Sequence, residues 1–196
     1  MRDGVTQFKK ALVLRAACKL FSERGYSATT IDAITAELSS SRRAIYDHFA
    51  GKAEILAEIC EQSVRLSVDL AERVAAEPGD PLTRLRRLAC DFTAIVIDNR
   101  DHIAVGTHEM KFLPPEARRR ILRLQEKFDR LLTAMIADGV RQGLFASPDP
   151  ALSALTIAGM IIWVHRWYRE GGRLAAGEIA AAMGEAALRL VLAENP

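Results

Sequence analysis

Residues 41–52, SRRAIYDHFAGK, hold side chains whose types and spacing favour binding to a ligand with regularly spaced negative charges. The hydroxylated and cationic residues at the start of this segment are Ser41, Arg42, Arg43 and Tyr46. Positions three and four apart are neighbours on a helix, so a helix that begins after Ser41 gathers the two arginines and the tyrosine on one side. Ile45 and Phe49 fall on the opposite side and can dock the helix onto a core. A helix that reads the DNA major groove needs this division.

Three predicted helices must position this face. The first is expected over about residues 6–24, and Gly25 follows it, where a left-handed cap suits glycine. The apolar positions of this helix, which we expect to fall roughly on one face, are Phe8, Leu12, Cys18, Leu20 and Phe21. Thr29 or Thr30 is expected to cap the second helix. Three serines at residues 39–41 predict a turn, and the last of them is expected to cap the third helix.

This region resembles the TetR family of bacterial transcription regulators over about residues 8–56. The residues that carry the resemblance, in the family's order and spacing, are Phe21, Gly25, Tyr26, Thr29, Thr30, Ile31, Ile34, Ser41, Ala44, Ile45, Tyr46, His48, Phe49 and Lys52. The resemblance implies that four residues contact DNA phosphates: Thr30, Tyr46, His48 and Lys52. It implies that three residues contact base edges: Ser41, Arg42 and Arg43.

Two positions depart from the family's usual pattern. The family often has Gly-Val in the turn where this chain has Ser39-Ser40, and it often has a small residue where Arg43 stands. The first departure concerns the geometry of the turn. The second predicts an unusual base preference or an extra phosphate contact.

The charge distribution supports an interaction with nucleic acid. The net charge of the 196 residues is only +2, but residues 1–52 hold nine Lys/Arg against five Asp/Glu, and the remainder carries a net charge of −2. Binding to DNA by counterion release requires such a local concentration of positive charge.

Other chemistries find little support. The three cysteines, at 18, 60 and 90, are widely spaced and have no histidine pairing typical of zinc, so we expect buried free thiols. The four histidines have no recognisable catalytic partners, and the chain offers no nucleophile–base set and no glycine-rich phosphate loop. We therefore expect no enzyme, no catalytic residue, no metal and no cofactor. The longest apolar stretch, residues 151–164, is too short to span a membrane, so we expect a cytoplasmic protein with no membrane partner.

Beyond residue 52 the pattern stays helical, without the alternation typical of strands. Helices are expected over about residues 53–76, 82–99, 115–142, 149–170 and 175–193, with a less regular piece over about 100–114. The predicted fold is all-α. It comprises a three-helix helix-turn-helix DNA-binding domain over residues 1–52 and a helical bundle for ligand binding and dimerisation over residues 53–196.

The last two predicted helices indicate a homodimer. Residues 149–170 are apolar nearly all round, and residues 175–193 are rich in alanine and glycine, which let another helix approach closely. Burial against a second copy explains this pair better than packing within one chain. In TetR-like proteins the last two long helices usually build the dimer. The two helix-turn-helix domains of such a homodimer would match the half-sites of a palindromic operator in double-stranded DNA, which lie about 34–36 Å apart.

The family resemblance also implies an inducer pocket in the helical body. Residues 163–173 resemble the C-terminal helices of TetR-type regulators of fatty-acid or steroid catabolism, which sense acyl-CoA thioesters. Aromatic side chains suit an acyl chain or ring, and arginines suit phosphates. The candidate ligand residues are Phe92, His108, Met110, Phe112, Trp163, Arg166 and Trp167. The two tryptophans suit a dimer interface equally well.

The sequence thus predicts a homodimeric transcriptional regulator, a repressor released from its operator by a small hydrophobic inducer such as an acyl-CoA. Two alternatives stay open. An efflux-type regulator would sense hydrophobic cations through an acidic group such as Glu109, which is close to Met110 and Phe112 in the sequence. A helical interaction module without sequence-specific DNA binding would tolerate the loss of Arg42 and Tyr46.

Overall fold

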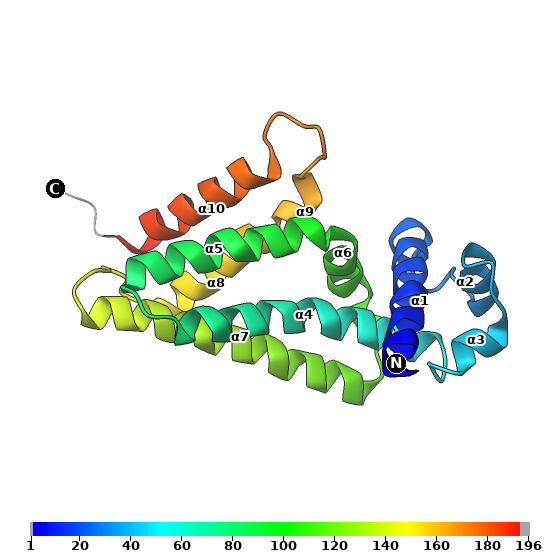
Figure 1. Ribbon diagram of the computed structural model, residues 1–196. Helices are drawn as coiled ribbons and strands as arrows, with labels where there is room; N and C mark the ends of the chain where they lie inside the picture. Colours follow the sequence, from blue (N-terminus) through cyan, green and yellow to red (C-terminus); the bar gives the residue numbers. More distant parts are fainter. Residues whose placement is uncertain (1, 193–196) are drawn as a thin grey trace. The chain divides into compact units, whose positions relative to one another are not determined.

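The computed structural model describes residues 2–192 of the 196, with residues 2, 3 and 5 described by their backbone alone. Every regular element in this range is helical, which confirms the all-α prediction. The elements are α1 (Arg2–Arg24), α2 (Ile31–Glu37), α3 (Arg42–Tyr46), α4 (Lys52–Ala76), α5 (Pro81–Asp98), α6 (Arg100–Glu109), the 3-10 turn η1 (Met110–Phe112), α7 (Pro115–Arg141), α8 (Pro150–Ile162), α9 (Val164–Trp167) and α10 (Ala176–Val191) (Figure 1).

The helices form two compact units. Unit 1 contains the chain up to Ser63 together with Asp101–Ile121. Unit 2 contains Val64–Arg100 and the chain from Leu122 onward. Packing therefore groups α6, η1 and the start of α7 with the three N-terminal helices, and the expected boundary after residue 52 stays a prediction. No helix within residues 2–192 combines the length and the apolar character that a bilayer crossing requires.

Side-chain caps explain where α2 and α3 begin. The Thr30 hydroxyl accepts a hydrogen bond from the N–H of Ala33 at 3.1 Å. The Ser41 hydroxyl accepts one from the N–H of Ala44 at 3.3 Å. Each bond satisfies an N–H that the first turn of a helix leaves without a backbone partner. Both caps agree with the sequence prediction.

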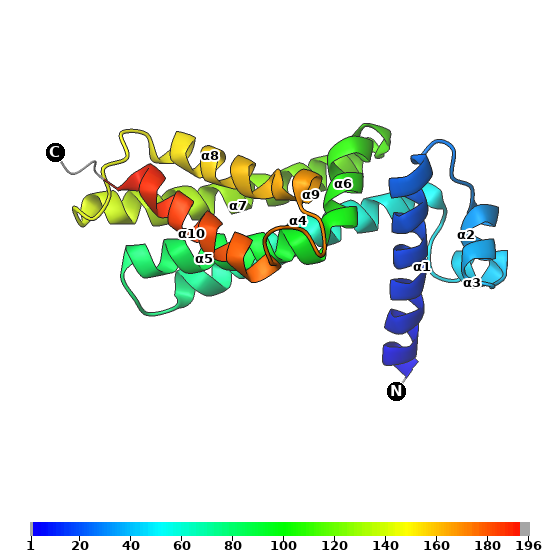
Figure 2. The same cartoon turned by 90° about the horizontal axis from the view of Figure 1, so that it is seen from above.

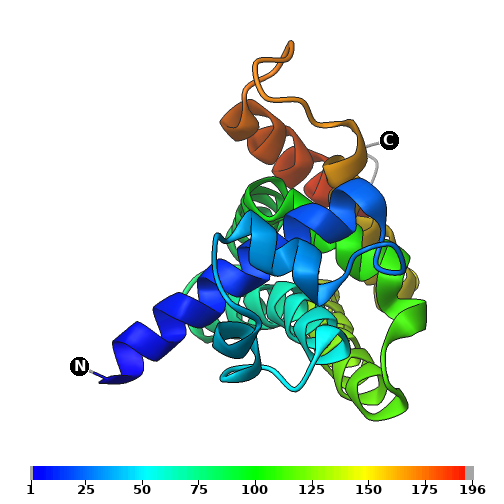
Figure 3. The same cartoon turned by 90° about the vertical axis from the view of Figure 1, so that its right-hand side faces the viewer.

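Loops join α2 to α1 and to α3 (Figure 3), and each of these two connections contains a residue with positive φ. Gly25 ends α1 with φ +81°, as predicted, and its N–H donates to the Phe21 carbonyl at 3.0 Å. Ser39 has φ +48° in the turn between α2 and α3. Residues that carry a side chain rarely adopt this left-handed backbone conformation, so Ser39 occupies a position that suits glycine. The departure from the family's Gly-Val therefore falls on a residue with left-handed backbone.

The core of unit 1 joins the second half of α1 to its neighbours. Its most buried side chains include Ala17, Phe21, Ile34, Ile45, Phe49, Ile55, Leu56 and Ile59. Burial along α1 begins at Val13, whereas Phe8 and Leu12 are 65% and 38% exposed. These two residues were expected on the same face as Cys18, Leu20 and Phe21, but they stay exposed because the early turns of α1 lie outside the packed part of the unit.

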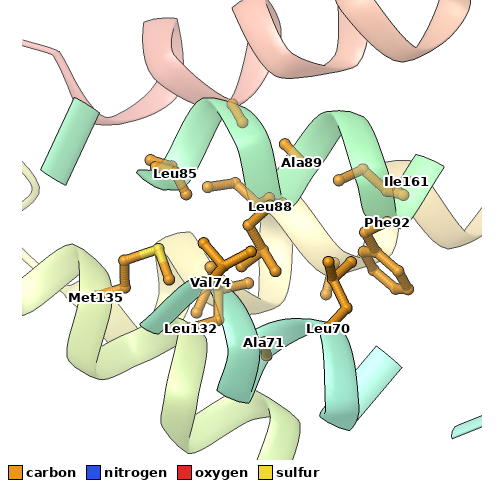
Figure 4. Close-up of a cluster of buried hydrophobic side chains, with 14 of the residues drawn as sticks. Leu70, Ala71, Val74, Leu85, Leu88, Ala89, Phe92, Leu132, Met135 and Ile161 are labelled. Atoms are coloured by element: carbon orange, nitrogen blue, oxygen red, sulfur yellow. The ribbon is translucent and has the colours of Figure 1, made fainter. Parts of the chain in front are cut away.

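Unit 2 is built around a continuous apolar core between α4, α5, α7 and α8. Figure 4 shows Leu70, Ala71 and Val74 of α4 facing Leu85, Leu88, Ala89 and Phe92 of α5, with Leu132 and Met135 of α7 and Ile161 of α8 completing the cluster. The Asp80 side chain caps α5 by accepting from the N–H of Thr83 at 2.8 Å, and Pro81 follows at the first helical position. The predicted break before α5 is therefore confirmed.

Helix α10 packs along α5 in unit 2 (Figures 1 and 2). A Cβ built on Gly184 would lie 2.5 Å from Cys90 Sγ, so the glycine permits the close approach of the two helices.

The bounds of some helices differ from those expected. A single helix was expected over residues 149–170, but the chain forms two helices there, α8 and α9, which are separated at Trp163. Helix α9 ends at Tyr168, where the backbone becomes extended (ψ 137°). The expected end of the last helix, Ala193, lies outside the described residues. The piece expected to be irregular contains the ten-residue helix α6.

Candidate nucleic-acid interface

The two faces of α3 are divided as the spacing predicts. Ile45 is fully buried and Phe49, just beyond the helix, is 2% exposed, so the apolar side holds α3 on the core of unit 1. Tyr46 is 53% exposed, and Arg42 and Arg43 are exposed as well. A helix of five residues cannot stay folded alone, so the buried side and the Ser41 cap keep the polar side in place.

Arg42 is held by an acidic residue of the preceding helix. Its Nε and Nη2 donate to the two carboxylate oxygens of Asp32 in α2, a bidentate pair. The guanidinium lowers the pKa of Asp32 below its usual value. Both side chains are more than half exposed, at 65% and 57%, so the pair orients Arg42 more than it stabilises the fold.

Lys52, at the start of α4, makes contacts inside the protein. Its Nζ donates to the carbonyls of Tyr26 and Thr29, both at 2.7 Å, and lies 4.2 Å from the centroid of the Tyr26 ring. Burial lowers the pKa of the ammonium. Since an ammonium has three N–H donors, one remains for another acceptor. The phosphate contact implied by the family resemblance stays a prediction, and the two carbonyl contacts are an additional role.

The remaining implied phosphate contacts have different surroundings. Thr30 is exposed and its hydroxyl already accepts from Ala33 at the start of α2. His48 is half-buried, and its backbone N–H donates to the Ile45 carbonyl at 3.0 Å. All seven residues predicted to contact DNA thus lie in unit 1, on or beside α2, α3 and the start of α4.

The candidate ligand residues fall into separate groups. In unit 2, Phe92 is 3% exposed and packs on Phe128 with ring centroids 4.9 Å apart. Trp163 and Trp167 are 59% and 44% exposed, and the guanidinium of Arg166 lies 5.9 Å from the Trp163 ring. The tryptophans therefore do not share the buried surroundings of Phe92.

Three other candidates belong to unit 1. His108 is exposed and Met110 is half-buried. Phe112 stacks on Tyr26, with ring centroids 5.2 Å apart and an interplanar angle of 27°. Glu109, the acidic group of the efflux alternative, has Oε1 3.7 Å from where a Cβ on Gly25 would lie. Phe112 and Glu109 therefore adjoin the connection between α1 and α2.

One buried polar group was not among the predicted site residues. His165 is 7% exposed, and its Nδ1 lies 2.6 Å from the Ile162 carbonyl, so Nδ1 carries the proton and donates. Its Nε2 is buried without a protein partner in the described structure. A histidine directly after the apolar run of α8 is a signal the sequence offered, but helical periodicity alone does not distinguish a ligand contact from a packed histidine.

Unit 2 also has an open cleft of about 320 Å³ between the start of α5 and the end of α10. Its lining residues are Asp80, Leu82, Thr83, Arg86, Glu185, Leu188, Arg189 and Leu192. None of the candidate ligand residues lines this cleft.

A capped pair of short helices with a cationic, hydroxylated outer face defines a helix-turn-helix DNA-binding protein. Residues 13–59 match the family described as "Bacterial regulatory proteins, tetR family", and residues 78–191 match "Tetracyclin repressor-like, C-terminal domain". The chain belongs to the TetR family of transcription regulators.

Similar proteins agree with this membership. The HTH-type transcriptional repressor KstR2 of Rhodococcus jostii is 26% identical over 174 residues, which cover 88% of this chain and 85% of KstR2. The TetR family regulator PfmR of Thermus thermophilus is 33% identical, with a TM-score of 0.84 over 90% of this chain and 97% of PfmR. AibR, solved in complex with isovaleryl coenzyme A and operator DNA, has a TM-score of 0.80 at 24% identity, covering 91% of this chain and 97% of AibR.

Proposed function

We propose that this TetR-family repressor binds a palindromic operator as a homodimer and is released by an acyl-CoA thioester. The observation that carries the DNA-binding part is the divided face of α3, with Ile45 buried and Arg42, Arg43 and Tyr46 exposed. Arginines of this kind recognise guanine edges by bidentate hydrogen bonds, and a tyrosine hydroxyl can donate to a phosphate.

The test of DNA binding uses fluorescence anisotropy with duplexes from the gene's own upstream region and with random duplex. Arg42→Ala and Tyr46→Ala should each weaken operator binding at least tenfold, because each removes a contact in both half-sites. Arg123→Ala, an exposed arginine of α7, is the matched control and should bind as wild type. A wild-type protein without a salt-sensitive preference for the upstream DNA would support the interaction-module alternative instead.

The homodimer is supported by an exposed apolar stripe along α8 and α9. Leu152, Leu155, Trp163 and Trp167 are 61%, 56%, 59% and 44% exposed, and the outer side of α10 carries exposed Ala181 and Ala182. A stripe of this size on a single chain favours burial against another copy. Leu155→Asp should convert the dimer to a monomer in light scattering, whereas Leu66→Asp, at 37% exposure on α4, should not.

The inducer class is supported by the aromatic and cationic groups of α8 and α9 and by the acyl-CoA complex of the structural neighbour AibR. Native mass spectrometry of freshly purified protein with added isovaleryl-CoA, and with longer acyl-CoAs, tests this class. A bound thioester that lowers operator affinity is expected. Trp163→Ala separates the two roles of this residue: loss of dimer with intact thioester binding would assign it to the interface. Binding of a cationic dye, abolished by Glu109→Gln, would favour the efflux alternative.

A further inference from the structure

An aromatic stack in unit 1 joins segments far apart in the sequence. Phe112 of η1 stacks on Tyr26, and the Tyr26 ring also lies 5.4 Å from the ring of Phe21. The ammonium of Lys52 lies 4.2 Å from the centroid of Tyr26. Tyr26 therefore contacts η1, α1 and the start of α4 at once.

The same ammonium fixes the backbone between α1 and α2. Lys52 Nζ donates to the carbonyls of Tyr26 and Thr29. The buried Thr29 hydroxyl lies 2.9 Å from the Gly25 carbonyl and 3.3 Å from that of Leu20, so it donates back to the end of α1. The next residue, Thr30, caps α2. Residues 25–30 are thus held by one cation and one hydroxyl, and their path sets where α2 begins.

The position of the Lys52 ammonium depends in turn on Tyr26. A cation near an aromatic ring is attracted to the ring's face, and a second ring stacked on the first restricts its rotation. Phe112 is 39% exposed, so its ring contacts Tyr26 without being enclosed in the core. Burial lowers the pKa of Lys52 and raises that of Tyr26, consistent with partial removal of this cluster from water.

We propose that Phe112 and Tyr26 are positioning residues for DNA binding. Their stack holds the Lys52 ammonium on the carbonyls of residues 25–30, and this contact orients α2 and the helix α3 that follows it. Phe112 lies outside the helix-turn-helix in the sequence and acts through Tyr26. This inference rests on the proposed DNA-binding function and adds η1 to the parts of the protein that determine operator affinity.

The test combines operator binding with hydrogen exchange of the DNA-free protein. Phe112→Ala and Phe112→Leu should both weaken operator binding about three- to tenfold, and Phe112→Tyr should restore it, because a ring rather than apolar volume is required. Leu122→Ala, a residue of similar exposure (38%) in α7, is the matched control and should bind as wild type. Amide exchange in residues 26–31 should rise in the alanine and leucine variants and return to the wild-type rate in Phe112→Tyr.

Three results overturn the proposal. They are wild-type operator affinity in Phe112→Ala, equal affinities of Phe112→Leu and Phe112→Tyr, and unchanged exchange of residues 26–31 in the alanine variant. The exchange measurement needs no DNA, so it decides whether Phe112 orders this connection even if wild-type protein binds no operator. A wild-type protein that binds no operator would refute the proposed function rather than this inference. If Phe112→Ala lowers the midpoint of global unfolding, the leucine and tyrosine variants still decide between a ring and simple packing.

Discussion

Replacement of Lys52 by methionine distinguishes its two roles. The TetR-family resemblance implies that Lys52 contacts a phosphate, whereas the structure shows its ammonium on the carbonyls of Tyr26 and Thr29. Methionine keeps most of the length and apolar stem of lysine but removes the charge and all three donors. Lys52→Met should therefore lower both protein stability and operator affinity, with separate signatures for each.

The expected loss of stability follows from the two hydrogen bonds. A hydrogen bond to a charged group contributes about 1.5–3 kcal/mol. Because one half-buried ammonium serves both carbonyls, we expect about 2 kcal/mol for the pair together. In a chain of this size about 1 kcal/mol lowers the melting temperature by roughly 2–4 °C, so the variant should melt about 4–8 °C below wild type.

The phosphate role has a different signature, the dependence of operator affinity on salt. Each phosphate neutralised in B-DNA contributes about 0.9 to the slope of log K against log salt concentration. Two copies of Lys52 in a dimer should therefore reduce the slope by about 1.8 when both are replaced. Lys127, a partly exposed lysine paired with Glu72 in unit 2, provides the control: Lys127→Met should change stability by less than about 1 kcal/mol and leave the slope unchanged.

The outcomes separate cleanly. A melting temperature of Lys52→Met equal to that of wild type would refute the reasoning that the ammonium holds residues 25–30. A lowered melting temperature with an unchanged salt slope would leave Lys52 a structural residue and remove it from the phosphate contacts. Both measurements use the full chain, by calorimetry and by anisotropy titration between 50 and 200 mM salt, the range over which such slopes are readily measured.

Two further predictions concern packing and buried thiols. Gly184→Ala should lower the free energy of unfolding, measured in urea, by about 1–3 kcal/mol, because the new Cβ would lie 2.5 Å from Cys90 Sγ. Gly177→Ala is the control and should not lower it, because open space surrounds Gly177. Equal stability of the two variants would show that α10 can move away from α5. Burial raises the pKa of Cys18 and Cys60 from 9.0 to about 12, so their thiols favour folding below pH 9 and this advantage is lost as the pH rises from 9 toward 12. From pH 8 to pH 10, the free energy of unfolding of wild type, measured in urea, should fall by about 1.4 kcal/mol more than that of Cys18→Ala. An equal fall in both proteins would contradict the raised pKa of Cys18.

The elements best predicted from sequence are those set by short-range signals. Thr30 and Ser41 as caps, Gly25 as a left-handed end and the break before Pro81 all depend on groups within four residues. Such hydrogen bonds and backbone preferences act locally, so tertiary packing does not need to be known. The division of α3 into a buried and an exposed face was predictable for the same reason.

Elements set by tertiary packing were not predictable. Helix α6 lies in the piece expected to be less regular, and Val105 is the one buried residue within it. The helix expected over residues 149–170 is divided at Trp163 although apolar residues continue as far as Tyr168. Both depend on contacts with other segments, which a window of sequence does not contain.

The candidate sites show the same limit. Tyr26 and Phe112 are 86 positions apart, and the carbonyls that Lys52 contacts lie 26 and 23 positions away from it. No periodicity relates such positions, so their meeting emerges only in the folded chain. The candidate ligand residues were chosen by type, and the fold distributes them over the core of unit 2, the exposed side of α8 and α9, and α6 and η1 in unit 1.

The pair between Arg42 and Asp32 bears on how the reading face recognises its operator. The bidentate partner occupies the Nε/Nη2 edge of the Arg42 guanidinium before DNA is present, so less side-chain freedom remains to be lost on binding. The carboxylate of Asp32 would repel a nearby phosphate, so it penalises registers that bring the backbone rather than a base edge to Arg42. Because both side chains are exposed, exchange of Asp32 for a guanine edge costs little. We therefore expect Asp32 to affect the choice between operators more than the affinity for DNA in general. Binding-site selection with Asp32→Asn should then yield a broader set of sequences at similar affinity, and an unchanged set with weaker binding would refute this role.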